Sequence, residues 1–377
     1  MSRTGVLLLL AILLAACDEG APPASPTRTA HLVLPPWATV APGDTTRLHA
    51  VVLDSNGSPR GVAVTWTSAD RAIGAVDGAG LVTGGGAGVV TITATAGLLT
   101  NRVVVAVQPA VLVGAGDIAS CTSLGDEATA ALLDTLAGIV FTLGDNVYPD
   151  GRPRAYQDCY DGSWGRHRAR TRPAPGNHDY HTAGASGYFG YFGTLAGDSG
   201  KGYYSYDVGT WHIVSLNSNV PMNAGSRQEQ WLRTDLATHP TLCTLAYWHH
   251  PRFSSGTTHG STAATQPLWQ ALYDAGADVV VSGHEHNYER FAPQTPTGEH
   301  DSERGIREFV VGTGGDSHFP FGTPLANSER RDNTTFGVLR LTLKPRGYDW
   351  RFIPEAGMSF TDWGSGTCHP ARPRRSP

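Results

Sequence analysis

The residues best suited to chemistry stand in the stretch Val279-Val280-Val281-Ser282-Gly283-His284-Glu285-His286. A short run of β-branched residues ends there in a glycine and two histidines that are one residue apart. Alternate residues of an extended chain point to the same side, so we expect His284 and His286 to project together if the strand continues through Glu285. Two imidazoles presented in this way could bind a metal ion. An isolated pair of this kind is also compatible with solvated loop histidines or with a pair that forms only hydrogen bonds.

Four other segments place polar residues directly after an apolar run or a glycine. They are Gly116-Asp117, Gly144-Asp145-Asn146-Val147-Tyr148, Gly176-Asn177-His178-Asp179 and His249-His250-Pro251. Each segment taken alone has an ordinary explanation, because Gly-Asp and Gly-Asn sequences are common in turns. Five such segments in one chain favour a shared site, since ligands of layered α/β proteins gather at the carboxyl ends of the strands.

The segments around these residues alternate between strand and helix patterns. The apolar run Ala110–Val113 is followed by helical spacing over Gly125–Leu136 and then by a second apolar run, Ile139–Leu143. Ser226-x-x-Glu229 is a capping box that predicts a helix over Arg227–Ala237. Repeated strand–loop–helix units indicate a layered α/β domain. Further elements are expected at 242–248, 267–274, 277–282, 308–311, 337–343 and 348–353.

The ordered set of five segments resembles the calcineurin-like metallophosphoesterase superfamily and, within it, the purple acid phosphatase branch. The resemblance to that branch rests on Tyr148, three residues after Asp145, and on Asn287-Tyr288-Glu289-Arg290 after the two histidines. It implies an α/β catalytic domain at 110–370, a two-sheet β-sandwich flanked by helices in αββα layers. One departure is Ala119, which stands where relatives usually carry a second glycine.

The resemblance also implies a centre of two metal ions, whose ligands differ in kind. Asp145 would bridge the ions, with Asp117, Tyr148 and His286 on the first ion and Asn177, His249 and His284 on the second. Carboxylate and phenolate oxygens suit Fe(III), whereas imidazole and amide ligands suit Zn(II), Mn(II) or Fe(II). Two ions about 3.5 to 4 Å apart can clamp a phosphoryl group and activate a hydroxide for in-line attack.

Three further histidines acquire roles from the same resemblance. We expect His178 to stabilise the transition state or to protonate the leaving group, with Asp179 orienting its imidazole. His259 is expected to face the substrate. His250 is a second candidate for substrate contact, and its position beside His249 leaves open which of the two binds metal.

The resulting functional expectation is hydrolysis of phosphate esters, with phosphomonoesters as the first choice of substrate. A phosphodiesterase or nucleotide pyrophosphatase on the same scaffold is one alternative. A surface-binding protein that carries an inactive hydrolase domain is the other. No proposed ligand is missing from the sequence, which favours the enzyme.

Short alternating strands precede the catalytic segment, at Arg47–Leu53, Val62–Thr67, Val89–Thr95 and Val103–Val107. Such spacing predicts an all-β sandwich, and the sequence over 30–108 resembles a bacterial Ig-like domain of group 2. It contains no cluster of histidine, cysteine and carboxylate, so we assign it no chemistry, and a surface ligand for it is unknown.

The amino terminus resembles a lipoprotein-type signal peptide over 1–17. Arg3 precedes the apolar run Val6–Ala16, and Leu14-Ala15-Ala16-Cys17 resembles a bacterial lipobox, which implies lipidation of a mature amino terminus at Cys17. An ordinary signal peptide is the alternative. Either form predicts export. The lipoprotein form places the protein in the cell envelope, with membrane contact only through the lipid anchor. A spacer rich in Pro, Ala and Ser follows at 18–29, and a basic tail closes the chain at 371–377.

Four cysteines remain once Cys17 is set aside. In an oxidising compartment they allow three pairings, and free buried thiols are a further alternative. We favour Cys121 with Cys159, which lie beyond two loops of the predicted metal site, and Cys243 with Cys368, which would fix the end of the chain to a strand.

Composition limits the other partners. The 377 residues carry a formal net charge of -5, so the chain lacks the basic character expected for binding nucleic acid or an anionic membrane. Its 46 glycines and 25 prolines indicate a chain rich in loops and strands rather than a helical bundle.

Overall fold

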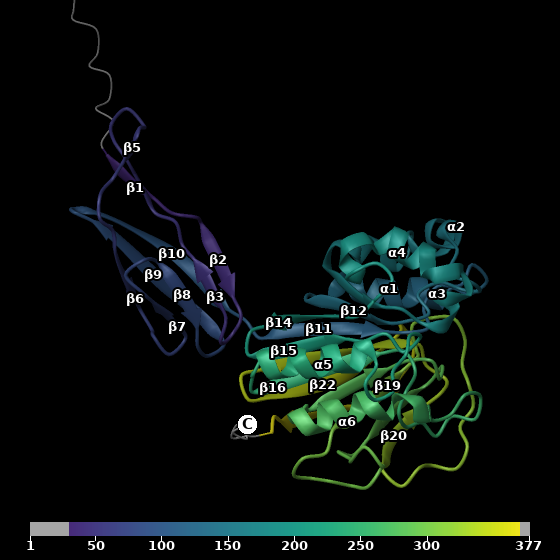
Figure 1. Cartoon of the computed structure of the whole chain (residues 1–377). Helices are drawn as coiled ribbons and strands as arrows, with labels where there is room; N and C mark the ends of the chain where they lie inside the picture. Colours follow the sequence, from purple (N-terminus) through teal and green to yellow (C-terminus); the bar gives the residue numbers. More distant parts are fainter. Residues whose placement is uncertain (1–29, 370–377) are drawn as a thin grey trace, which may run out of the picture.

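The computed structural model describes residues 30–369, which form two lobes joined near Val107 and Ala110 (Figure 1). The predicted signal peptide with Cys17, the spacer at 18–29 and the basic tail at 371–377 lie outside the described residues. Within 30–369, no helix combines the length and apolar character needed to cross a bilayer.

The first lobe is the predicted β-sandwich. Its sheets have the strand orders β2-β10-β9-β6, β1-β4-β5 and β3-β8-β7, and Val82, Ile92, Val103 and Val105 are fully buried between them. Its strands are β1 (His31–Val33), β2 (Trp37–Val40), β3 (Thr45–Arg47), β4 (Val51–Leu53), β5 (Pro59–Arg60), β6 (Thr65–Ser68), β7 (Gly74–Val76), β8 (Leu81–Gly84), β9 (Gly88–Ala96) and β10 (Leu99–Val107).

The continuous strand expected over Arg47–Leu53 is wrong. The chain leaves one sheet after Arg47, at the end of β3, and enters another at Val51, at the start of β4. Between them Leu48 turns into the core with 3% of its surface exposed. An alternating pattern cannot show such a change of sheet, because both strands keep the same period of two.

The second lobe packs two sheets against each other and covers them with helices on both sides. One sheet has the order β13-β12-β11-β21-β22-β23 and the other β14-β15-β16-β17-β19-β18-β20. Leu339 and Leu341 of the first sheet pack with Val281 and Phe309 of the second. Figure 1 shows α1, α3 and α4 on the outer side of β11 and β12, with α5 and α6 on the other side of the lobe. This arrangement is the predicted αββα layering.

The strands of this lobe are β11 (Ala110–Ala115), β12 (Ile139–Leu143), β13 (Thr171–Ala174), β14 (Tyr204–Val208), β15 (Trp211–Ser215), β16 (Cys243–Trp248), β17 (Val279–Ser282), β18 (Tyr288–Phe291), β19 (Arg307–Val311), β20 (Ser328–Asp332), β21 (Gly337–Lys344), β22 (Gly347–Pro354) and β23 (Trp363–Thr367). The helices are α1 (Gly125–Thr135), α2 (Pro153–Ala155), α3 (Asn177–His181), α4 (Ser186–Phe192), α5 (Arg227–Thr238) and α6 (Gln266–Ala275), with short helical turns η1 (Tyr156–Tyr160), η2 (Trp164–Arg170), η3 (Ala183–Ala185), η4 (Gly193–Ala196) and η5 (Ala263–Thr265).

Parallel pairing brings the strand ends together. Strands β11, β12 and β13 are parallel in one sheet, and β15, β16, β17 and β19 are parallel in the other. The five polar segments of the sequence follow β11, β12, β13, β16 and β17. Each segment therefore begins at a carboxyl end.

Two disulfides link outer segments of this lobe, and both have the pairing favoured from the sequence. Cys121–Cys159 joins the loop after β11 to η1, and Cys243–Cys368 joins β16 to the segment after β23.

The capping box at the start of α5 forms with one change. The hydroxyl of Ser226 accepts a hydrogen bond from the backbone N–H of Glu229 at 3.3 Å. The carboxylate of Glu229 accepts from the N–H of Gly225 at 3.0 Å, one residue before the cap. Two N–H groups at the helix start are thereby satisfied.

A buried histidine links α5 to the sheet. His212 on β15 is 1% exposed, and its Nδ1 and Nε2 lie 2.7 Å from Asp207 Oδ1 and 2.8 Å from Asp235 Oδ2. Both partners are carboxylates, so both ring nitrogens donate and the imidazole is the cation. Burial opposes that charge, but hydrogen bonds to Asp235 and Asp207 outweigh it and raise the pKa of His212.

This network predicts a stability that depends on pH. The unfolded pKa of histidine is about 6.5, and the folded pKa of His212 is higher, so its contribution is complete below about pH 6.5 and is lost as the pH rises through the folded value. His212→Gln should cost about 1.5–3 kcal/mol at about pH 6 and less at about pH 9, measured as the shift in Tm at each pH. The exposed loop histidine variant His300→Gln is the control. An equal Tm loss at both pH values would contradict the assignment.

Candidate metal centre

Three residues at the strand ends adopt the left-handed backbone conformation. Asp117 has φ 60°, Asp145 φ 47° and His284 φ 72°. Residues other than glycine rarely take this conformation, and such residues concentrate at functional sites. Both aspartates are buried, with 0% and 1% of their surfaces exposed. The turns therefore direct two carboxylates into the protein instead of into solvent.

In each of these carboxylates one oxygen accepts a backbone hydrogen bond, and the other oxygen faces the neighbouring side chains. Asp117 Oδ2 accepts a hydrogen bond from the N–H of His284, and Asp145 Oδ1 accepts one from the N–H of His178, both at 2.8 Å. The remaining oxygens, Asp117 Oδ1 and Asp145 Oδ2, face a group of polar side chains. The backbone thus fixes the orientation of both aspartates.

The first group surrounds the hydroxyl of Tyr148. This oxygen lies 3.0 Å from Asp117 Oδ1, 3.1 Å from Asp145 Oδ2 and 3.0 Å from His286 Nε2. A phenol has one proton and cannot donate to both carboxylates at once. Burial, followed by the charges of Asp117 and Asp145, raises the pKa of Tyr148 well above its usual value. A cation among these atoms would satisfy all four side chains.

The second group surrounds Nε2 of His249. That nitrogen lies 2.9 Å from Asn177 Oδ1, 3.2 Å from Asp145 Oδ2 and 3.1 Å from His284 Nδ1. The other ring nitrogen, Nδ1, donates to the carbonyl of Leu143 at 2.7 Å, so Nε2 of the neutral ring carries a lone pair toward Asp145 and Asn177. Burial lowers the pKa of His249, but the charge of Asp145 outweighs burial and raises it to about 9. A proton or a metal ion is therefore favoured at this position.

The two groups share Asp145 Oδ2, and together they contain all seven residues predicted as ligands. Their oxygens and nitrogens are of the kinds that bind Fe, Zn and Mn. Asp117, Asp145 and His249 offer ligand atoms within 4.8 Å of one another, and so do His249, His250 and His284. The residues present fit two metal ions with Asp145 between them, and their assignment as ligands remains a prediction.

The two histidines of the His-x-His pair reach the site by a different route from the one expected. Strand β17 ends at Ser282, and the extended conformation does not continue through Glu285. The chain instead turns tightly. The N–H of Glu285 donates a hydrogen bond to the carbonyl of Gly283 at 2.9 Å, and the N–H of Asn287 donates one to the carbonyl of Glu285 at 2.7 Å. His284 consequently joins the second group and His286 the first.

Glycines flank the aspartates because no side chain fits there. A Cβ on Gly176 would lie 2.1 Å from Asp145 Oδ1, and one on Gly283 would lie 2.6 Å from Asp117 Oδ2. Both distances are far below van der Waals contact. The glycines before Asn177 and His284 are thus required by the carboxylates.

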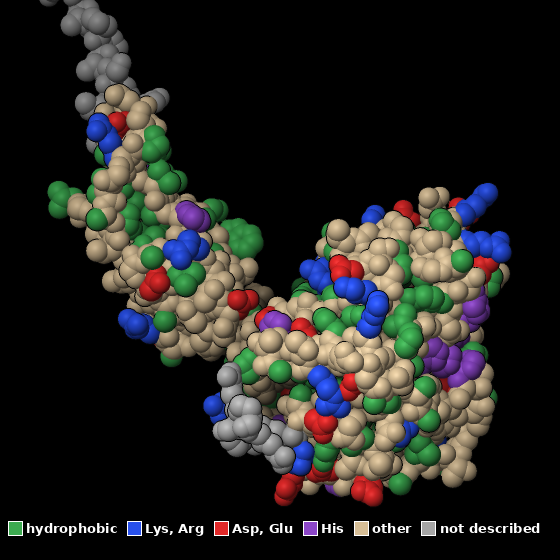
Figure 2. Space-filling view, in the orientation of Figure 1, with side chains coloured by type: hydrophobic (Ala, Val, Ile, Leu, Met, Phe, Trp, Pro, Cys, Tyr) green, Lys and Arg blue, Asp and Glu red, His purple; other side chains and the backbone are tan. Residues whose placement is uncertain are grey.

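The three other predicted histidines surround the centre. His178 Nδ1 lies 2.7 Å from the carbonyl of Pro149, and its Nε2 lies 4.0 Å from Asp145 Oδ2. The ring of His259 stacks on that of His284 at 4.1 Å between centroids. His250 lies against His284 at 4.3 Å, and burial together with the charge of His249 lowers its pKa to about 3. Figure 2 shows histidine side chains gathered at one end of the larger lobe.

The expectation that Asp179 orients the imidazole of His178 is wrong. The carboxylate of Asp179 instead accepts hydrogen bonds from the N–H of Gly176 at 2.8 Å, from Asn146 Nδ2 at 3.0 Å and from the hydroxyl of Tyr156 at 2.6 Å. It therefore ties the loop after β13 to the loop after β12. The carbonyl of Pro149 orients His178.

Sequence reasoning missed the residues that support the ligands. His286 Nδ1 lies 2.8 Å from the hydroxyl of Ser317, which donates to Asp316 at 2.9 Å. The ring of Phe319 stacks on His286 at 3.9 Å. Glu285 is fully buried and accepts from the N–H of His259 at 2.6 Å. A signal was present, because Gly314-Gly315-Asp316-Ser317 follows the apolar strand β19 as the other polar segments follow theirs.

Family models match both lobes. The calcineurin-like phosphoesterase model matches residues 108–288, and the model of the bacterial Ig-like domain (group 2) matches residues 29–107. The first lobe therefore matches a bacterial Ig-like domain and the second lobe a calcineurin-like phosphoesterase domain. This family implies a centre of two metal ions.

Several of the related proteins are purple acid phosphatases. The chain is 36% identical to purple acid phosphatase 15 of Arabidopsis thaliana over 100 residues, 25% of this chain and 19% of that protein. It is 32% identical to purple acid phosphatase 23 of the same plant over 163 residues, 38% of this chain and 35% of that protein. The chain thus spans about a fifth to a third of the length of these curated relatives.

A solved structure shares the fold. Purple acid phosphatase PPD1 from yellow lupin (Lupinus luteus) aligns with a TM-score of 0.54 and 16% sequence identity, covering 91% of this chain and 70% of that one. The predicted fold class is confirmed.

The glycine contacts predict the effect of adding one methyl group beside the centre. Gly176→Ala would displace Asp145, so the metal content should fall from about two ions per chain to below about one, measured by elemental analysis. Gly190→Ala is the control, because a Cβ at Gly190 meets nothing within 4 Å. Undiminished metal in the folded Gly176→Ala protein would contradict the proposed place of Asp145.

Proposed function

We propose that this chain hydrolyses phosphate esters, and phosphomonoesters in particular, at a centre of two metal ions. The observation that carries the proposal is the convergence of seven side chains in two groups that share Asp145 Oδ2. The relatives named purple acid phosphatases support the choice of monoesters.

The two groups differ in a way that selects the ions. Asp117, Tyr148 and His286 supply two oxygens and one nitrogen, which suits Fe(III). Asn177, His249 and His284 supply one oxygen and two nitrogens, which suits Zn(II), Mn(II) or Fe(II). When bound, the ions lower the pKa of a water so that hydroxide is present near neutral pH, and they neutralise phosphoryl charge.

The chain's own groups then orient the phosphoester and manage the leaving group. His178 is placed to act on that leaving group. The carbonyl of Pro149 can only accept, so His178 Nδ1 carries a proton and Nε2 faces the centre. In the imidazolium form Nε2–H can be donated to the departing alkoxide, which is general acid catalysis.

A cavity beside Tyr148 offers space for the organic part of the ester. Its volume is about 600 Å³, and its walls include Pro149, Asp316, the Cys121–Cys159 disulfide and Arg152. Cavities of this size hold molecules as large as a typical drug. We assign the leaving group to this side and place His259 and His250 on the opposite side, over His284.

The place of action follows from the sequence beyond the described residues. We propose that the signal peptide directs export and that lipidation of Cys17 holds the protein at the outer side of a membrane. The Ig-like domain at 30–108 would then separate the catalytic domain at 110–370 from the anchor.

Two substitutions separate metal binding from proton transfer. Asp145→Asn should lose metal together with about a hundredfold or more of the activity, because the shared ligand loses its charge. His178→Gln should keep its metal while kcat falls by about 10²–10⁴-fold. Turnover of p-nitrophenyl phosphate and elemental analysis measure both, with His300→Gln as the control.

The same assay tests the substrate class. If bis(p-nitrophenyl) phosphate is hydrolysed faster than p-nitrophenyl phosphate, the protein is a phosphodiesterase and the phosphomonoesterase proposal is wrong. An Asp145→Asn protein with full activity would remove the metal centre from the proposal altogether.

Colour tests the identity of the first ion. A phenolate of Tyr148 bound to Fe(III) gives a visible charge-transfer band, so the purified protein should be coloured. Tyr148→Phe should retain the fold and lose the band. A colourless wild-type protein that contains iron, or a band that persists in Tyr148→Phe, would contradict the ferric assignment.

A further inference from the structure

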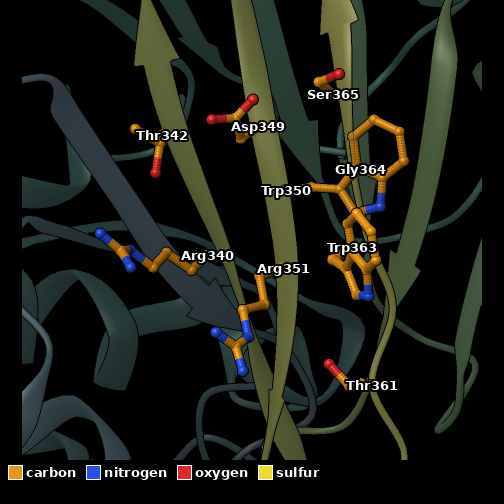
Figure 3. Close-up of a pocket in the computed structure, with 9 residues that line it drawn as sticks. All are labelled: Arg340, Thr342, Asp349, Trp350, Arg351, Thr361, Trp363, Gly364 and Ser365. Atoms are coloured by element: carbon orange, nitrogen blue, oxygen red, sulfur yellow. The ribbon is translucent and has the colours of Figure 1, made fainter.

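The outer face of β21, β22 and β23 carries a row of three side chains that nothing in the catalytic centre uses. Arg340 on β21 is directly opposite Arg351 on β22, and Arg351 is directly opposite Trp363 on β23. Figure 3 shows these residues lining one cavity. Leu339 and Leu341 point the other way and are buried, so the row faces outward.

Neither guanidinium has a partner within the described residues, since no hydrogen bond, ion pair or ring contact of the Arg340 or Arg351 side chain occurs there. The carboxylate beside them, Asp349, is engaged by Lys344 at 2.6 Å. Like charges directly opposite each other on neighbouring strands are destabilising. Two unpaired arginines side by side thus form a site at which an anion would be stabilising, because each guanidinium can bind a carboxylate or sulfate group through two N–H donors.

Trp363 adds a flat apolar surface at the end of the same row. It is 75% exposed, although large apolar side chains generally bury most of their area. An exposed indole next to arginines can stack on a ring-shaped ligand while the arginines bind its charge.

The neighbouring row supplies hydrogen-bonding groups. Thr342, Asp349 and Ser365 are opposite one another across the same three strands, and the hydroxyls of Thr342 and Ser365 make no hydrogen bond within residues 30–369. The cavity over both rows has a volume of about 690 Å³, which is within the range that holds a ligand of a few rings.

We propose that this face binds an acidic saccharide chain, with Arg340 and Arg351 on a carboxylate or sulfate, Trp363 stacked on a sugar ring and the Thr342 row on hydroxyl groups. An anionic membrane fits less well, because lipid recognition uses clusters of about 4–8 basic residues. An acidic peptide would leave Trp363 and the hydroxyls without a specific role. The net charge of -5 makes non-specific attraction to a polyanion weak, so binding requires a local site.

Surface plasmon resonance of the full chain over immobilised polygalacturonate tests the proposal, with amylose as a neutral saccharide surface and polyglutamate as an acidic surface without sugar. The protein should bind polygalacturonate, and Arg340→Gln, Arg351→Gln and Trp363→Ala should each weaken binding by about tenfold or more. Arg71→Gln and Trp37→Ala remove an exposed arginine and an exposed tryptophan from the other lobe, and they should have no effect. Turnover of p-nitrophenyl phosphate should be unchanged in all five variants, which reports an intact fold.

Several outcomes would overturn the proposal. One is the absence of binding to polygalacturonate, and another is an equal loss in the Arg71 and Trp37 controls. Equal binding to polyglutamate would show that charge alone is recognised and would make an acidic peptide the partner. Equal binding to amylose would remove the arginines from the site.

Discussion

The buried carboxylate of Asp145 is the constraint on which the larger lobe depends. A carboxylate with 1% of its surface exposed is stable only if it is compensated. One of its oxygens receives the N–H of His178, which holds the loop after β13 against the loop after β12. The other oxygen lies between Tyr148 and His249, which follow strands β12 and β16 of different sheets. Oδ1 of Asp145 is therefore compensated by a backbone N–H, whereas Oδ2 has no backbone donor among the described residues. A positive charge is favoured beside Oδ2. Asp117 repeats this arrangement with the N–H of His284.

This constraint explains why the turns are built as they are. Asp117 and Asp145 turn back into the protein through a left-handed conformation. That turn leaves no space for a Cβ on the glycines that pass behind the carboxylates, such as Gly176 and Gly283. The strain of such conformations is of the order of 1–3 kcal/mol for each residue, and packing of two sheets with a shared core offsets it. Single hydrogen bonds orient two of the proposed histidine ligands in a similar way. The carbonyl of Leu143 fixes His249, and the hydroxyl of Ser317 fixes His286. In each case one ring nitrogen is occupied and the other faces the centre.

Much of the candidate centre could be predicted because most of its residues follow a strand that is evident in the sequence. Asn177 is the exception, since strand β13 before it is not among the expected elements. Strand β12 and helix α5 begin at the expected residues, and all seven proposed ligands converge. The pattern of residues does not predict the turn at Glu285, because a histidine in the left-handed conformation has no signature in the sequence. Proximity in sequence also predicts the wrong partner for Asp179: it favours His178, whereas the fold brings Asn146 and Tyr156 to the carboxylate of Asp179. Contacts between distant segments, such as that of Ser317 with His286, depend on sheet order. Periodicity does not reveal that order.

The six-stranded sheet carries negative charges at one place and positive charges at another. At the carboxyl ends of β11 and β12 it concentrates buried carboxylates, and on the outer face of β21 and β22 it sets two arginines directly opposite each other. In both places like charges lie close together without a full set of partners among residues 30–369, although one place is buried and the other is open to solvent. Desolvation makes the buried charges far more costly to leave unpaired, so a strongly bound cation is expected there. The exposed arginines are screened by water and salt, so an anion bound to them would exchange readily. A tight catalytic centre and a weak, reversible contact with an acidic surface are therefore what these two placements favour.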